Sequence, residues 1–89
     1  MIEVSFSSAF IRAFNKKIKG QPDLEKIFYE KLQLFIENPF DPRLKTHKLS
    51  GKLQDMWSFS ITYQIRVTFT FVKSDLVLFE DFGTHTAVY

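Results

Sequence analysis

The periodicity of apolar residues changes abruptly near the middle of the sequence, and this change limits the folds that the chain can adopt. Between residues 57 and 71 apolar and polar residues alternate, as they do in strands with one buried face. Between residues 8 and 37 apolar residues recur every three or four positions, which predicts amphipathic helices. Helices followed by a sheet in this way indicate an α+β fold, with the helices packed on one sheet face.

Two helices are expected in the first half of the chain. The hydroxyl of Ser7 or Ser8 offers an N-cap for the first helix, and Gly20 suits its end. Its apolar stripe is expected to contain Ile11, Phe14 and Ile18. The second helix is expected to begin at Pro22 and to stop at Pro39. The very short link between the helices predicts an antiparallel hairpin.

Four strands complete the expected fold. Three of them are expected to form an antiparallel meander, over residues 57–62, 65–71 and 76–82. Residues 2–6 also alternate and predict a strand that joins the same sheet. One face of the meander is apolar and must be covered by the helical hairpin. The other face carries Ser60, Arg66, Thr68 and Thr70. We expect this polar face to be open to solvent, with Arg66 at its centre.

Length and composition restrict the class of protein further. With 89 residues the chain is expected to form a single domain over residues 1–89. Its 11 phenylalanines can fill a small core, since each aromatic side chain buries about 150–250 Å². The absence of cysteine excludes a disulfide framework, a zinc–thiolate site and a thiol nucleophile. It also fits a reducing compartment, and because the sequence shows neither a signal peptide nor a membrane span, we expect a cytoplasmic location.

The positive charge of the chain is concentrated in its middle third. Residues 41–73 contain six basic and two acidic residues, although the whole chain has a net charge of only +2. Four of the basic residues lie close together, at Arg43, Lys45, Lys48 and Lys52. A cluster of this kind attracts phosphate groups. The alternative is a solvated surface loop that binds nothing.

Few residues in the chain can carry out chemistry. The sequence has no glycine-rich phosphate loop, no His-Glu-x-x-His and no Gly-x-Ser-x-Gly, and its two histidines make a weak metal site. We therefore expect neither a metal nor a cofactor. Acid–base work by His47 and His85, supported by Arg66, remains, and such groups can cleave RNA without a metal. Each of the three alone is typical of a solvated surface residue, so the hypothesis depends on their meeting around the polar face.

Five segments of the sequence together resemble a known family. They are residues 47–53 (HKLSGKL), 56–61 (MWSFSI), 65–69 (IRVTF), 82–85 (FGTH) and 87–89 (AVY). In this order they resemble the RelE/ParE superfamily of bacterial toxins, and the chain is most similar to its RelE and YafQ-like branch. The resemblance covers nearly the whole chain, including the two leading helices.

The resemblance implies a compact microbial-RNase-like domain that acts as the toxin of a type II toxin–antitoxin system. The activity that the resemblance implies is that of a metal-independent, ribosome-dependent mRNA endoribonuclease, which inhibits translation and which a small antitoxin neutralises. The implied partners are a cognate antitoxin, the ribosome and mRNA, with no membrane and no small-molecule cofactor.

Individual residues match the motifs of this family. His47 matches the histidine before a Leu-x-Gly, and His85 matches the histidine of a Gly-Thr-His element, which serves as general acid or base. Arg66 matches an arginine that contacts the scissile phosphate. The resemblance thus implies catalytic roles for His85, His47 and Arg66. Substrate-binding roles are assigned to Lys48, Lys52, Tyr63 and Tyr89.

The sequence also departs from the family pattern. Ser60 stands where many members have a basic residue or histidine, and Gln64 stands where YafQ-like members have an aspartate. Asp81 stands where an arginine often precedes the glycine element, and an acidic group there repels phosphate.

Two alternatives to the nuclease therefore stay open. One is a ParE-like toxin that poisons DNA gyrase and needs no catalytic residues, but the pair of histidines favours the nuclease over it. The other is a catalytically weakened toxin homologue that mainly binds its antitoxin, which Ser60 and Asp81 favour. A shared fold cannot choose among these functions.

Overall fold

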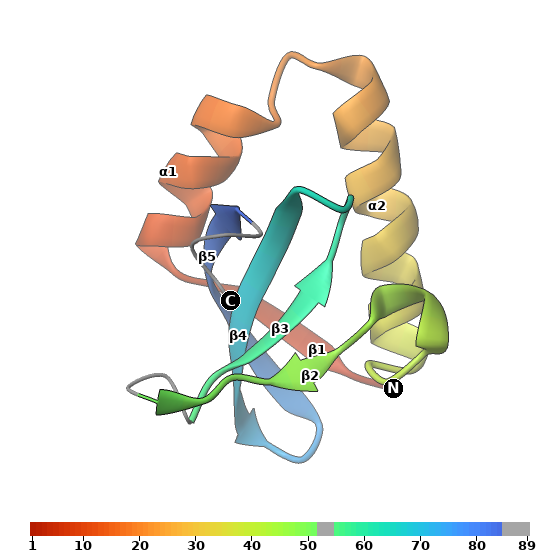
Figure 1. The fold of residues 1–89 in the computed structure, drawn as a ribbon, viewed down its shortest axis with the longest axis vertical. Coiled ribbons are helices and arrows are strands. Elements are labelled where there is room, and N and C mark those ends of the chain that lie inside the picture. Colours follow the sequence, from red (N-terminus) through yellow and green to blue (C-terminus); the bar gives the residue numbers. More distant parts are fainter. Residues whose placement is uncertain (52–54, 85–89) are drawn as a thin grey trace.

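The structure, a computed structural model, describes residues 1–51 and 55–84 of the chain (Figure 1). The elements in chain order are β1 (Glu3–Phe6), α1 (Ser8–Lys17), α2 (Pro22–Glu37), the 3-10 turn η1 (Pro42–Leu44), β2 (His47–Lys48), β3 (Trp57–Ser60), β4 (Ile65–Lys73) and β5 (Leu76–Thr84). The predicted α+β class, with two helices between the first strand and the meander, is confirmed. No described helix is long and apolar enough to cross a membrane.

The strands form one mixed sheet in the order β1-β5-β4-β3-β2. The meander β3-β4-β5 is antiparallel as predicted, and β1 joins it as a parallel neighbour of β5. The sheet has a fifth strand that the sequence did not predict, because β2 contains only His47 and Lys48, too few residues to show a period of two. His47 and Lys48 pair with Ser58 and Trp57 of β3, and a hydrogen bond of 2.8 Å from the Leu49 amide to the Met56 carbonyl continues the pairing.

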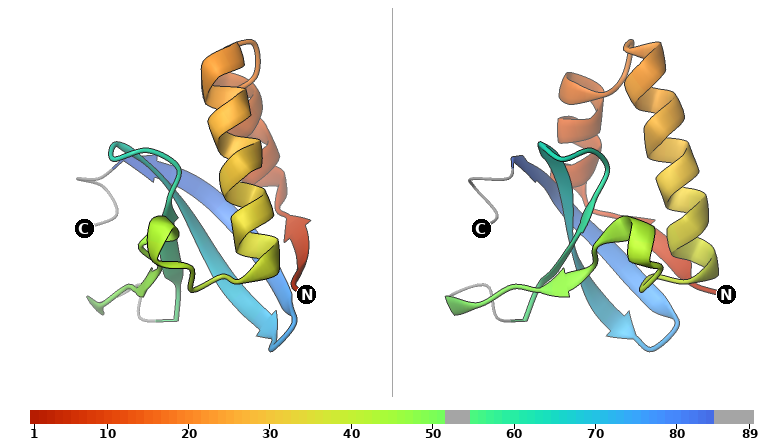
Figure 2. Two further views of the ribbon diagram at one scale, coloured as in Figure 1. Left: turned by 90° about the vertical axis from the view of Figure 1, so that its right-hand side faces the viewer. Right: turned by 45° about the vertical axis from the view of Figure 1, so that its right-hand side comes forward.

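Both helices lie on one face of the sheet (Figure 2). Ser7 is the N-cap of α1, since its Oγ accepts a hydrogen bond of 2.9 Å from the amide of Phe10. Gly20 adopts a positive φ of 85° in the link, a conformation that favours glycine. Pro22 lies at the start of α2, as predicted, and the rings of Phe14 and Phe28 meet at 5.1 Å between the two helices.

The apolar stripe of α1 differs from the predicted one at one position. Ile11 is 49% exposed, and Phe10, which is 2% exposed, occupies the buried position instead. The ring of Phe10 stacks on Phe82 of β5 at 4.5 Å. The prediction failed because residues 10, 14 and 18 also recur at helical spacing, and only the position of the sheet decides between the two stripes.

Phe35 of α2 is the centre of the core. It is fully buried, and its ring lies 4.8, 5.0 and 5.2 Å from the rings of Phe59, Phe69 and Phe79 on three neighbouring strands. The alternating residues of β3 and β4 therefore turn their apolar side toward the helices. Their polar side faces the other way, which fixes the position of the candidate site.

Candidate functional site

The strand register brings the polar residues of four strands into two rows on the face away from the helices. In the first row His47 pairs with Ser58, Ser58 with Thr68, and Thr68 with Asp81. In the second row Ser60 pairs with Arg66, and Arg66 with Gly83. Because directly paired residues project to the same side of a sheet, these side chains share one face. We call this set the polar face.

Arg66 lies on the polar face as predicted, but it is not open to solvent. It is only 3% exposed, and its Nη1 donates a hydrogen bond of 2.6 Å to Oγ of Ser60. Its Cζ lies 5.9 Å from the ring centroid of Tyr63, within range of a cation–π contact. The guanidinium therefore lies along the sheet, held toward Ser60, instead of extending into water.

The expected open face is thus wrong for the residues around Arg66. Ser58, Ser60 and Thr68 are 0%, 6% and 9% exposed. Thr68 donates a hydrogen bond of 3.2 Å to the carbonyl of Asp81 on the next strand. These short side chains lie between longer neighbours, so alternation in the sequence gives their direction but not their exposure. Arg66 also lies near the start of β4 and not at the centre of the face.

His47 lies in the short strand β2 and is held by the sheet. It is half-buried in β2, and its Nδ1 lies 3.1 Å from the carbonyl oxygen of Lys45. Since a carbonyl can only accept, Nδ1 is the donor of this hydrogen bond, and Nε2 is a buried atom. From strand spacing, the Cα atoms of His47 and Arg66 are roughly 12 Å apart. Two side chains of this length can reach the same phosphodiester.

The predicted substrate-binding residues are divided between the two sides of the sheet. Tyr63 is 64% exposed beside Arg66, so it belongs to the site. Lys48 is exposed but pairs with Trp57, which places it on the helix side of the sheet, away from Arg66. Lys52, His85 and Tyr89, which were predicted to bind or act on substrate, lie outside the described residues.

The electrostatics of this region are less basic than the sequence suggested. Asp81 shares the row of His47, and its carboxylate accepts a hydrogen bond of 2.8 Å from the amide of Phe82. In the basic cluster, Arg43 donates to Asp41 at 2.8 Å, and this hydrogen bond lowers the pKa of Asp41 to about 2. Arg43 is therefore engaged within its own turn.

The sequence did not predict how two polar residues, Ser58 and Ser60, take part in the site. Ser60 was placed on the polar face and noted as a departure from the family, but its hydrogen bond with Arg66 was not predicted. Ser58 is fully buried between His47 and Thr68, and within the described chain its Oγ has no hydrogen-bond partner. The signal was present in the sequence, because both serines alternate with Trp57 and Phe59. Among the described residues no group of three potential metal ligands comes together.

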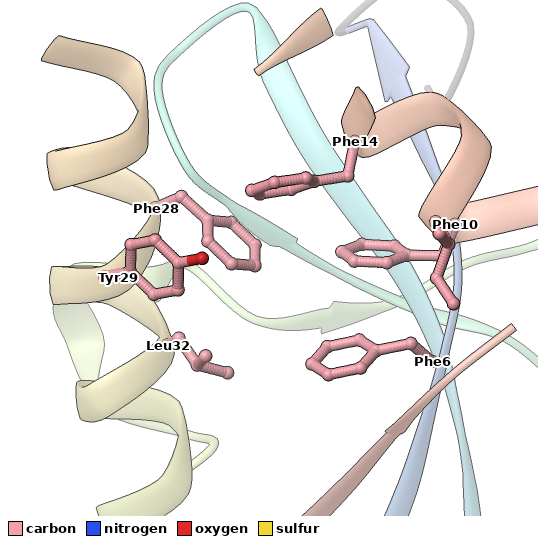
Figure 3. Close-up of a pocket in the computed structure, with 7 residues that line it drawn as sticks. Phe6, Phe10, Phe14, Phe28, Tyr29 and Leu32 are labelled. Atoms are coloured by element: carbon pink, nitrogen blue, oxygen red, sulfur yellow. The ribbon is translucent and has the colours of Figure 1, made fainter. Parts of the chain in front are cut away.

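Away from the polar face, a hollow of about 270 Å³ lies between the two helices and β1 (Figure 3). It is lined by Phe6, Phe10, Ile11, Phe14, Phe28, Tyr29 and Leu32. In Figure 3 the rings from α1 and α2 point toward one another across it. Among these side chains only Tyr29 has a polar atom, so this groove cannot supply acid–base chemistry. It is suited to an apolar ligand instead.

The fold is similar to solved structures of bacterial toxins. A metal-bound toxin from Helicobacter pylori is 22% identical, with 100% of both chains covered and a TM-score of 0.76. YafQ from E. coli strain BL21(DE3) is 18% identical, with 100% of this chain and 99% of that chain covered and a TM-score of 0.69. A YoeB/ParE toxin from Agrobacterium tumefaciens is 13% identical, with 94% and 99% covered and a TM-score of 0.77.

YafQ of E. coli has also been solved with DinJ, in a structure described as a toxin–antitoxin complex. No protein-family model matches the sequence, and no curated protein sequence matches it. At these identities the likeness concerns the fold. The resemblance that the sequence motifs indicated is therefore confirmed at that level: this chain has the same fold as the YafQ and YoeB/ParE toxins.

Proposed function

We propose that the chain is the toxin of a type II toxin–antitoxin system, a metal-independent endoribonuclease that cleaves mRNA on the ribosome. The observation that carries the proposal is the arginine on the polar face. Arg66 is 3% exposed and lies toward Ser60, and His47 is in the adjoining row. The toxin structures with the same fold support the proposal.

Arg66 is held in position by its neighbours on the polar face. Its Nη1 donates to Ser60, and its Cζ lies 5.9 Å from the ring centroid of Tyr63. An arginine held in this way suits a phosphate site, because its planar fork fits two phosphate oxygens.

The proposed reaction divides proton transfer and charge stabilisation between these residues. One histidine of the pair His47 and His85 would take the proton of the 2′-hydroxyl, and the 2′-oxygen would then attack the adjacent phosphorus. Arg66 would stabilise the negative charge that builds up on the phosphate oxygens. The other histidine of the pair would protonate the 5′-oxygen as it leaves. Tyr63 would stack on a base beside the phosphate.

A cleavage assay on programmed ribosomes tests this assignment. Arg66→Ala should lower the rate about 10²–10³-fold, the usual effect of losing one charge-stabilising donor. Arg12→Ala removes a matched arginine from the exposed side of α1 and should leave the rate unchanged. Cleavage in the presence of a chelator should equal cleavage in its absence once ribosomes are held intact by separately supplied polyamine. Equal rates for the Arg66 and Arg12 variants would rule out the assignment.

A cognate antitoxin is the proposed protein partner, and the DinJ–YafQ complex supports this part of the proposal. The groove between the helices can receive the apolar side of an antitoxin helix. Phe6, Ile11 and Tyr29 line it and are 43%, 49% and 55% exposed. A helix laid into a groove of this kind buries apolar side chains at regular spacing.

A second candidate function has its own support. Asp81 lies in the row of His47, and Lys48 lies on the other side of the sheet, so the polar face has fewer cations than a strong nuclease would use. These two placements favour a weakened toxin homologue that mainly binds its antitoxin. Tight antitoxin binding without ribosome-dependent cleavage by the unaltered protein would select this function.

A further inference from the structure

Three aromatic rings form a cluster on the helix side of the sheet, beyond the end of α2. Phe40 follows α2, Trp57 begins β3, and Phe71 lies near the end of β4. The centroid of Phe40 is 5.5 Å from that of Trp57 and 6.1 Å from that of Phe71, and Trp57 and Phe71 are 5.7 Å apart. We call these three residues the aromatic platform. Phe40 is 52% exposed, unlike the phenylalanines of the core.

The loop that carries Phe40 is fixed by hydrogen bonds. The amide of Phe40 donates to Oδ1 of Asn38 at 3.0 Å, and the hydroxyl of Thr46 donates to the carbonyl of Pro39. The Phe40 ring is nearly parallel to that of Phe71, at 18°. The ring is thus oriented by its neighbours while about half of the residue stays exposed. A flat ring in a fixed loop binds a planar ligand with little loss of entropy.

Positive charge lies beside this platform. Lys48 pairs with Trp57 across β2 and β3, so it belongs to the same side of the sheet, and Lys45 just before it is also exposed. Of the two acidic residues between residues 41 and 73, Asp41 is already paired with Arg43, and Asp55 is exposed two residues before Trp57. A ligand that is planar, apolar on its faces and anionic along its length fits this combination.

We propose that the aromatic platform binds single-stranded RNA, with a base stacked on Phe40 and a phosphate beside Lys48. This surface is on the side of the sheet opposite Arg66, so it holds a part of the strand away from the reacting phosphate. Stacking on an aromatic ring accepts any base, and the lysine adds a salt-dependent attraction. That the nucleic acid is RNA rests on the proposed function.

Fluorescence anisotropy with a 2′-O-methyl oligouridylate tests the platform, because this strand lacks the attacking hydroxyl and cannot be cleaved. Phe40→Leu keeps an apolar contact with Trp57 but removes the ring, and it should weaken binding about 5- to 150-fold. Phe40→Trp should restore it. Lys48→Gln should reduce the slope of the logarithm of the binding constant against the logarithm of the salt concentration by about 1, because one fewer counterion is released.

Tyr29→Leu is the matched control, since Tyr29 is an aromatic residue of similar exposure, 55%, on α2. It should bind the strand like the unaltered protein. Wild-type affinity in a folded Phe40→Leu variant, or an equal loss in Tyr29→Leu, would overturn the proposal. So would a failure of the unaltered protein to bind the strand.

The two proposals fail separately. If the unaltered protein cleaves mRNA on ribosomes but Phe40→Leu binds the oligouridylate normally, the platform is wrong and the nuclease stands. If Phe40→Leu loses binding but the unaltered protein cleaves no message, the platform stands and the proposed function is wrong.

Discussion

On the helix side of the sheet, Phe35 and Phe69 are fully excluded from solvent and touch other aromatic rings. On the other side, Ser58 and Arg66 are excluded almost as completely, yet they are polar. The apolar side gains stability from burial in proportion to its area. The polar side gains little, because each buried polar group gives up its water. Comparing the two sides separates the residues that hold the fold from those that we expect to carry out the chemistry.

The largest effect is expected on the apolar side. Phe35→Ala removes the ring that contacts three strands and leaves a cavity, which should cost about 3–5 kcal/mol of the free energy of unfolding. Small domains have about 5–15 kcal/mol in total, so the variant should be close to unfolding. Urea denaturation followed by circular dichroism measures the loss. A cost below about 1 kcal/mol would mean that Phe35 is not central to the core.

On the polar side we expect a substitution to lower activity while leaving stability nearly unchanged. Arg66→Met replaces a buried charge with an apolar side chain of similar length, which is often neutral or stabilising. Cleavage on ribosomes should nevertheless fall about 10²–10³-fold. Denaturation and cleavage are measured on the same preparation. A strongly destabilised variant would show that Arg66 is a structural residue.

The two serines sharpen the comparison within the polar face. Ser60→Ala removes the partner of a buried charge and should destabilise the fold by about 1.5–3 kcal/mol. Ser58→Ala removes a buried hydroxyl that has no partner in the described chain, so it should be neutral or slightly stabilising. Urea midpoints of the two variants provide the test. Equal costs would contradict the distinct roles given to them.

The smallest effect concerns a site outside both faces. Because Arg43 lowers the pKa of Asp41 from 3.8 to about 2, the folded state binds this proton less readily than the unfolded state. The stabilisation is therefore present above about pH 4 and is lost as the pH falls toward 2. Asp41 is on the surface, so the change should be small and reduced by salt. Asp41→Asn should remove this part of the pH dependence of the free energy of unfolding. If urea denaturation between pH 2 and 4 gave the same pH dependence for the variant and the unaltered protein, the role given to Asp41 would be wrong.

Much of the fold followed from local pattern. The period of two placed Arg66 opposite to Val67 and the core, and Pro22 and Gly20 placed the link between the helices. The direction of Arg66 and the position of the link depend only on neighbouring residues in the sequence, and the structure confirms the two predictions. The choice between Phe10 and Ile11 depended on where the sheet lies, which a helical period does not contain.

The site was predicted less completely, because it depends on contacts between distant segments. The side on which Lys48 lies is set by its pairing with Trp57, and a shift of one residue in that pairing would reverse it. Similarly, the hydrogen bond that Arg66 makes to Ser60 joins residues of two different strands, β4 and β3. Residue types and alternation predict candidates, but only the register of the sheet brings them together.

The claim that the polar face cleaves mRNA is tested most directly by mapping the 5′ ends of messages after induced expression. The unaltered protein should produce new ends at codon-phased positions within translated messages. The Arg66→Met variant, expressed at an equal level, should produce almost none, and Arg12→Ala should match the unaltered protein. Growth arrest by the Arg66→Met variant without new 5′ ends would contradict the account and favour the gyrase-poisoning alternative.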